Sequence, residues 1–403
     1  MGDAPRQYRP PPQWHGEPHR KEGVTSPGSV LPDEEKLDWL RLIRCDGIGP
    51  ISFKGLLESH GSARAVIEAL PEIARRSGRA LKLPSEASLQ RELQAMAALG
   101  ARFVAIGEAD YPVSLAAIDS APPLLAAWGS LAPLSRPMVA IVGARNASAL
   151  GRRFAATMAS ELANAGFTVV SGLARGIDEA AHSATIGNGT VAVVGGGLGN
   201  IYPPQHLQLA RDIGQAGCVL SEMPFDWVAT ARDFPKRNRI VSGLSLGVVI
   251  IEAAARSGSL ITARLALEQG RELMAVPGSP LDPRNEGSNK LLREGAVLVR
   301  HAGDVLEALA PLVERPVAPP RRPVQPRFNF EPPSSEAPPT PPFASTGDPD
   351  QDRLIAVLGP SPVAMDELVR ASGLDARRVQ LALLELDMSG RIERHGNGMV
   401  SLL

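Results

Sequence analysis

Apolar residues change their spacing along the chain, and these changes divide it into regions of different structure. Residues 34–100 carry apolar positions at helical spacing, which predicts a helical domain. From 101 to 312, short continuous apolar runs alternate with helical stretches. This second pattern is typical of an α/β domain whose parallel strands are covered on both faces. Residues 351–403 predict three helices and a small hairpin, which are the elements of a winged helix.

Two further regions contain little that a core would bury. Residues 1–33 are rich in Pro, His, Arg, Gly and Glu, and we expect a disordered tail there. Residues 313–350 predict an extended linker, because twelve prolines fall between Pro316 and Pro349. The chain therefore divides into a tail, a helical domain, an α/β domain, a linker and a winged helix.

The helical domain contains one short glycine motif. Gly47-Ile48-Gly49 joins two helical stretches, as in a helix-hairpin-helix, whose turn can present backbone N–H groups to a DNA phosphate. A single triplet of this kind favours a tight turn in a small helical bundle over direct DNA contact.

The α/β domain opens with two strand–turn–helix units in succession. Val139–Val142 is a buried strand that runs into the turn Gly143–Asn146, and a helix follows. Thr168–Val170 and the turn Ser171–Gly176 repeat this arrangement. Both turns lie at the edge where open α/β sheets bind ligands, and helix N-termini there favour anions. Each turn also contains an arginine, so we expect a phosphate-binding crevice.

A third glycine turn and a basic segment extend the same edge. Gly195–Gly199 follows another buried strand, and its glycines allow a ligand to approach the backbone closely. Between Ala229 and Arg271, seven Lys and Arg residues stand against three acids. This surplus lies at strand ends and is interrupted by Phe234, which favours a polyanion site over an ordinary solvated face.

Composition limits the classes of function. The formal net charge is −1, so an anion site has to be a local patch. Cys45 and Cys218 are far apart and lack metal-ligand spacing, which argues against a disulfide scaffold or a structural zinc. There is no apolar run near the ~18 residues of a membrane span, and no apolar segment follows the N-terminal basic residues as in a signal peptide. We expect a cytoplasmic protein without a metal site.

The motifs of nucleotide cofactors and of catalysis are missing or incomplete. The turn after the first strand departs from the G-x-G-x-x-G fingerprint, and the P-loop motif is absent, so we expect no dinucleotide cofactor and no ATPase. Asp178, His182, Glu222 and Glu252 lie near strand ends or helix starts, and Asp178 and His182 are spaced to meet on one helix. They form no recognisable nucleophile–base set, and helix capping explains such residues equally well.

Four longer motifs, in this order, resemble the DprA (Smf) family, the DNA-processing proteins of bacterial natural transformation. They are SGLARGIDEAAH at 171–182, GGGLGNIYPP at 195–204, FPKRNRIVSGLS at 234–245 and EAAARSGSLITARLALEQGRELMAVPG at 252–278. The resemblance implies an extended Rossmann-like sheet domain, a helical N-terminal domain of the SAM or helix-hairpin-helix type, and a C-terminal winged helix. It also implies binding of single-stranded DNA, homodimer formation and loading of the recombinase RecA, without catalysis.

The resemblance assigns roles to two residues of the predicted DNA site. The arginine of the first turn contacts phosphates in the family, which corresponds to Arg145, and the aromatic residue of the FP-x-RNR motif stacks on a base, which corresponds to Phe234. Some family members place a lysine shortly before this aromatic residue. This chain has none between Ala229 and Phe234, and Arg232 and Lys236 are the candidate substitutes. The predicted DNA-binding residues are Gly143, Arg145, Ser171, Gly172, Arg175, Gly176, Arg232, Phe234, Lys236, Arg237, Asn238, Arg239, Ser257, Gly258 and Ser259.

Two alternatives stay open at this point. The first is a nucleotide-processing enzyme related to the lysine-decarboxylase-like phosphoribohydrolases. Their PGG-x-GT-x-x-E signature would correspond to Ser257–Ala263, which contains no glutamate. The second concerns the winged helix, for which duplex binding and a protein-contact or structural role are both compatible with its few basic residues.

Overall fold

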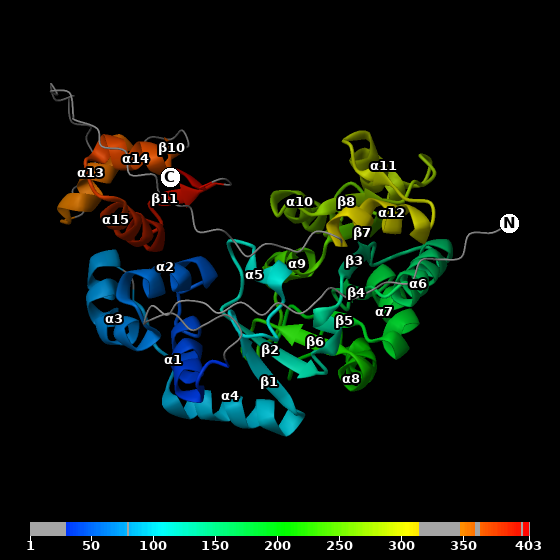
Figure 1. Cartoon of the computed structure of the whole chain (residues 1–403), viewed down its shortest axis with the longest axis horizontal. Helices are drawn as coiled ribbons and strands as arrows, with labels where there is room; N and C mark the ends of the chain where they lie inside the picture. The colour runs from blue at the N-terminus through cyan, green and yellow to red at the C-terminus, as the bar shows by residue number, and fades with distance from the viewer. Residues whose placement is uncertain (1–29, 79, 314–346, 359–362, 396–397, 403) are drawn as a thin grey trace, which may run out of the picture.

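The structure, a computed structural model, describes residues 30–78, 80–313, 347–358, 363–395 and 398–402. The predicted tail 1–33 lies outside the described residues except for 30–33, and so does the predicted linker except for 313 and 347–350. Figure 1 shows a helical domain, a central sheet domain and a small C-terminal domain that lies beside the helical one.

Helices form the first domain, as the apolar spacing predicts. Trp39 packs edge-on against Phe53, with the ring centroids 5.1 Å apart, and Leu42, Leu56 and Val66 are fully buried around them. Ser62 and Ser85 accept hydrogen bonds from the first turns of the helices that they precede, as N-cap residues do. The helices are α1 (Asp33–Ile43), α2 (Pro50–His60), α3 (Ala63–Ser77) and α4 (Glu86–Leu99).

A nine-stranded sheet forms the centre of the described structure, with the order β1-β2-β6-β5-β4-β3-β7-β8-β9. In the part of the sheet with the order β6-β5-β4-β3-β7-β8-β9, every neighbouring pair is parallel, which confirms the predicted parallel core. β1 pairs antiparallel with β2, and β2 antiparallel with β6, so this edge of the sheet is mixed. The strands are β1 (Ala101–Ala105), β2 (Leu124–Gly129), β3 (Met138–Gly143), β4 (Thr168–Ser171), β5 (Val191–Val193), β6 (Cys218–Ser221), β7 (Gly247–Ile251), β8 (Glu272–Ala275) and β9 (Val297–Leu298).

Helices cover both faces of this sheet, and alternate residues of each strand enter different cores. In β3, Val139 and Ile141 face α6 and α7, whereas Ala140 faces the core under α9 and α10. α8 and α12 complete the first face, and the short α5 and α11 flank the second. Their bounds are α5 (Val113–Ala116), α6 (Ala149–Asn164), α7 (Ile177–Thr185), α8 (Leu207–Ala216), α9 (Asp233–Leu244), α10 (Ser259–Glu268), α11 (Glu286–Arg293) and α12 (Ala302–Val313).

The C-terminal domain is a winged helix, as predicted. Three helices pack around Leu354, Leu368 and Leu383, all fully buried, and β12 pairs antiparallel with β10 and β11. The elements are α13 (Pro349–Val357), β10 (Val363–Ala364), α14 (Met365–Ser372), α15 (Ala376–Met388), β11 (Ile392–Arg394) and β12 (Met399–Leu402). Throughout the described ranges, every helix is too short or too polar to span a bilayer.

Candidate nucleic-acid interface

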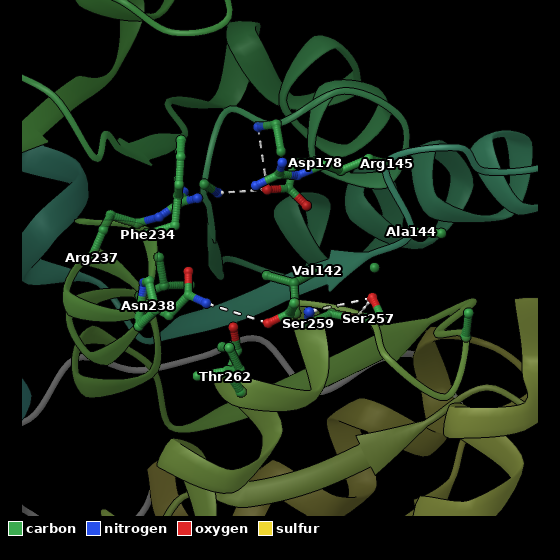
Figure 2. A pocket seen from close by; sticks show the side chains of 18 of the residues that line it. Val142, Ala144, Arg145, Asp178, Phe234, Arg237, Asn238, Ser257, Ser259 and Thr262 are labelled. Atoms are coloured by element: carbon green, nitrogen blue, oxygen red, sulfur yellow. Dashed lines mark hydrogen bonds between the residues drawn. The ribbon is translucent and has the colours of Figure 1, made fainter. Parts of the chain in front are cut away.

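A crevice of about 850 Å³ opens where the parallel strands end. Its walls come from the turn after β3, the turn after β4, the first turn of α9 and the segment that leads into α10 (Figure 2). β3 is the direct neighbour of both β4 and β7, so the loops after these strands converge at one edge. The predicted residues that line the crevice are Gly143, Arg145, Gly172, Phe234, Arg237, Asn238, Ser257, Gly258 and Ser259.

Two glycines of the turns are required by close packing. A Cβ added at Gly143 would lie 1.8 Å from the carbonyl oxygen of Ile251. A Cβ added at Gly172 would lie 1.6 Å from Nη1 of Arg237. The first glycine therefore lets the β3 turn pack against the end of β7, and the second makes room for a buried guanidinium.

Arg237 forms the floor of the crevice rather than an exposed contact. Its side chain is buried, and Nη1 donates a hydrogen bond of 2.9 Å to the carbonyl oxygen of Val193. Burial lowers the pKa of Arg237 to about 10, an effect that the nearby Asp178 carboxylate opposes and Arg145 reinforces. Asp178 is buried too, and it accepts hydrogen bonds from the backbone N–H groups of Gly172 and Ala174. The buried Asp178 and Arg237 therefore hold the second glycine turn.

Phe234 lies half-buried at the mouth of the crevice with cations over its ring. The guanidinium carbon of Arg145 is 5.0 Å from the ring centroid, and that of Arg237 is 5.9 Å away. The ring of Tyr202, 47% exposed, lies 5.6 Å from that of Phe234. An aromatic platform and a cation thus lie side by side at the opening, where Figure 2 shows Phe234 and Arg145.

Asp233 fixes the loop that carries Phe234. It accepts hydrogen bonds from Nε1 of Trp227, from the N–H and hydroxyl of Thr230 and from Nζ of Lys236. Burial on its own raises the pKa of Asp233, but these hydrogen bonds outweigh it and bring the pKa to about 2. The carboxylate is thus held ionised, and residues 227–233 are tied to the start of α9.

We expect Asp233→Asn to lower the free energy of unfolding by about 2 kcal/mol at pH 6. The folded pKa lies below the ordinary 3.8, so this stability is present above pH 4 and is lost as the pH falls toward 2. Roughly half of the difference between the two proteins remains at pH 3. Urea unfolding of both proteins at pH 6 and pH 3 measures it, and a difference that does not shrink at pH 3 would contradict the role of the ionised carboxylate.

A second hollow of about 440 Å³ adjoins the crevice and shares Arg145 with it. Arg152 from α6 and Arg175 from the turn before α7 line it, with Gly176 at the start of α7. Arg152 donates one hydrogen bond of 2.7 Å, to the carbonyl oxygen of Ala147. Within the described part of the chain, none of the three arginines forms an ion pair with a carboxylate. The hollow therefore presents three arginines against one carboxylate, that of Glu179.

Several predicted residues lie outside both hollows. Ser171 donates its hydroxyl to the carbonyl oxygen of Ile141, and Arg239 pairs with the Glu222 carboxylate. Lys236 pairs with Asp233 and is exposed, as is Arg232, and neither of the two basic residues lines the crevice. The FPKRNR segment thus contributes Phe234, Arg237 and Asn238 to the crevice, while its other basic residues point elsewhere.

The sequence prediction missed several lining residues. Tyr202 comes from the loop after the third glycine turn, and Arg256 and Arg284 come from the loops after β7 and β8. The signal for Tyr202 was present, because IYPP directly follows the glycine turn at the strand edge. Arg152 lies on α6, one turn beyond a glycine loop, and only its position in space connects it with Arg145 and Arg175.

The four residues considered for catalysis are each bonded separately. Asp178 holds backbone N–H groups, and Nδ1 of His182 lies 2.9 Å from the hydroxyl of Thr190. Burial lowers the pKa of His182 to about 3, which keeps the ring neutral. Glu222 pairs with Arg239, and Glu252 accepts from both the N–H and the hydroxyl of Ser148. In the described residues, therefore, Asp178 and His182 bond other partners rather than each other.

Three family models match the chain in succession. The model described as DNA recombination-mediator protein A matches residues 102–310. The model of a DprA-like N-terminal HHH domain matches residues 33–95, and that of a DprA winged helix domain matches residues 333–398.

Individual proteins are similar over most of their length. Protein Smf of Escherichia coli strain K12 is 39% identical over 297 residues, which cover 72% of this chain and 75% of that protein. DNA processing protein DprA of Bacillus subtilis strain 168 is 42% identical over 224 residues, covering 55% of this chain and 75% of the relative. The X-ray structure of DprA from Streptococcus pneumoniae is 34% identical and superposes with a TM-score of 0.54, over 67% of this chain and 92% of that one.

Proposed function

The chain belongs to the DprA (Smf) family of DNA recombination-mediator proteins, and from that premise we propose that its crevice binds single-stranded DNA. One observation carries the proposal: Arg145 lies over the half-buried ring of Phe234 at the mouth of a crevice lined by glycine turns. For a base to stack on Phe234, the Arg145 guanidinium moves off the ring face. It then lies beside the phosphate, because base and phosphate are adjacent along a strand. Stacking of this kind accepts any base, so the binding is sequence-tolerant.

The second hollow gives the strand backbone a path away from the base. Arg152 and Arg175 continue from Arg145 and lack ion-pair partners among the described residues. Consecutive phosphates of one strand can lie along such a row, and each is then neutralised by a guanidinium. We therefore propose that phosphates follow the row from Arg145 toward the start of α7, while bases lie toward Phe234 and Tyr202.

We propose a mediator role for the chain, without a catalytic step. In this role, residues 101–312 hold the DNA, two copies of the chain associate, and the bound strand is handed to the recombinase RecA in the cytoplasm. The names of the relatives, DNA processing protein and recombination mediator, support this role. Sedimentation equilibrium tests the dimer, and a RecA strand-coating assay with and without the chain tests the loading. Release of free base from a nucleoside monophosphate would support the enzymatic alternative instead.

Phe234→Ala is expected to lower the affinity for oligo-dT about tenfold. Stacking on an aromatic ring contributes roughly 1–3 kcal/mol per base, and alanine removes the platform. Fluorescence anisotropy with a labelled oligo-dT measures the change. Phe234→Trp is the matched control, because tryptophan retains an aromatic face and keeps the affinity near that of the unchanged chain. Equal affinities for the alanine and tryptophan variants would exclude stacking on this residue.

A further inference from the structure

The helix α15 of the winged helix has two apolar faces, and only one belongs to its own domain. Val379, Leu383 and Leu386 pack in the core of the winged helix. Leu384 and Met388 are 4% and 2% exposed, although they lie on the other side, because they enter the core of the helical domain. One helix thus takes part in two hydrophobic cores.

The contacts across this boundary come from α2 and α3. A Cβ added at Gly55 of α2 would lie 3.4 Å from Cδ1 of Leu384, so the two helices approach closely there. The guanidinium of Arg377 donates a hydrogen bond of 3.1 Å to the carbonyl oxygen of Ser59, near the end of α2. Arg76 of α3 lies 3.9 Å from the Glu385 carboxylate. Figure 1 shows α15 directly beside α2.

The docked face is the one that a DNA-reading winged helix would use. In a helix-turn-helix, the second helix of the pair lies in the major groove, and its N-terminal residues contact the base edges. Here the pair is α14 and α15. On the outer face of α15, Arg377 in the first turn and Leu384 and Met388 further along all contact the helical domain. A duplex could not reach that face while the two domains are packed together.

The charges of the winged helix also disfavour a duplex. Residues 349–402 contain eight acids against six arginines, whereas duplex binding rests on cations that neutralise phosphates. Arg378 is bound by Asp350, and Arg394 by Asp387. Arg377 is engaged by the carbonyl oxygen of Ser59. Arg370 donates to the carbonyl oxygen of Asp366, so four of the six arginines are already engaged within the protein.

We propose that the outer face of α15 is a protein-docking surface whose partner is the α2–α3 face of the helical domain, and that the winged helix does not read duplex DNA. The docking seals an apolar face on each domain and joins the two ends of the described chain into one unit. This inference rests on the packing of α15 and is independent of the single-strand crevice.

Two variants, one on each side of the boundary, test the docking in the full chain. Leu384→Asp puts a carboxylate into the shared core without touching the core of the winged helix, and Gly55→Asp does so from α2. Aspartate is tolerated at least as well as glycine inside a helix, so α2 itself is preserved. The control is Ala371→Asp, at an exposed position of α14, which is not one of the boundary helices. Hydrogen–deuterium exchange of α2 and α15 is the readout, with binding of oligo-dT and of a blunt duplex measured in parallel.

We expect both boundary variants to speed amide exchange in α2 and α15 by about tenfold or more, because local opening sets these rates. The control should exchange like the unchanged chain, oligo-dT affinity should stay within about twofold, and no variant should bind the duplex. Exchange in the boundary variants that matches the control would overturn the docking. A gain of duplex affinity in either variant would also overturn the proposal, because it would mean that docking covers a DNA-reading helix.

Discussion

Replacing Arg145 with alanine is expected to weaken binding of oligo-dT by roughly 30- to 100-fold at moderate salt. A hydrogen bond to a charged group contributes about 1.5–3 kcal/mol, and the upper part of this range, about 2–2.7 kcal/mol, corresponds to the expected factor. Because Arg145 forms no ion pair within the described ranges, its charge is available to a phosphate. Each phosphate contact also contributes about 0.7 to the slope of log affinity against log salt for a single strand, so the slope should flatten by about that amount.

The control for this measurement is Arg153→Ala. Arg153 is an exposed residue on α6 that lines neither hollow. Its replacement by alanine removes the same net charge as Arg145→Ala without touching the proposed path of the strand. Anisotropy titrations of the three proteins at several salt concentrations separate a specific contact from a general charge effect. If the Arg145 and Arg153 variants lose affinity equally, Arg145 has no special contact with the strand.

Arg237→Ala is expected to lower the free energy of unfolding by about 3 kcal/mol. Removing one of two interacting buried charges leaves the other uncompensated, and Asp178 would be that charge. The substitution also removes the hydrogen bond to Val193 and the guanidinium that fills the space over Gly172. Arg237→Lys should be intermediate, because the ammonium keeps the charge but lacks the planar fork of the guanidinium.

Urea unfolding of the Arg237 variants measures this loss, with Arg232→Ala as the exposed control. An exposed substitution usually changes the free energy of unfolding by less than ~0.5 kcal/mol. If Arg237→Ala were as stable as the control yet failed to bind oligo-dT, Arg237 would be a direct phosphate contact and not part of the floor. A structural role of Arg237 therefore predicts a large loss of stability, whereas a direct phosphate contact predicts none.

Much of the sheet and its binding edge follows from the order of apolar runs and glycine turns. Continuous apolar strands each followed by glycine predict both the parallel core and the edge where the turns gather. The antiparallel edge of β1 and β2 was not predicted, because strand direction depends on how far the chain travels between strands. The order of the strands is likewise set by packing of the helices on both faces, and not by any local motif.

The site was harder to predict than the sheet, because neighbouring residues of one motif point in different directions. In FPKRNR, Lys236 is exposed, Arg237 is buried and Arg239 is paired with Glu222. Which basic residue faces a ligand depends on the helical turn and on what lies behind it. The outer face of α15 was unpredictable for a similar reason. Leu384 directly follows Leu383, which packs in the core of the winged helix. The sequence alone does not show that Leu384 packs against a second domain.

The place where a single strand binds can be located by photocross-linking. Oligo-dT carrying 5-iodouracil is irradiated with the full chain, and the cross-linked peptides are identified by mass spectrometry. This reagent reacts with aromatic rings on which the base stacks, and Phe234 and Tyr202 are the rings at the crevice. We predict cross-links at Phe234 or Tyr202 that disappear with an excess of unlabelled oligo-dT. Competable cross-links confined to the winged helix or the helical domain would contradict single-strand binding in the crevice.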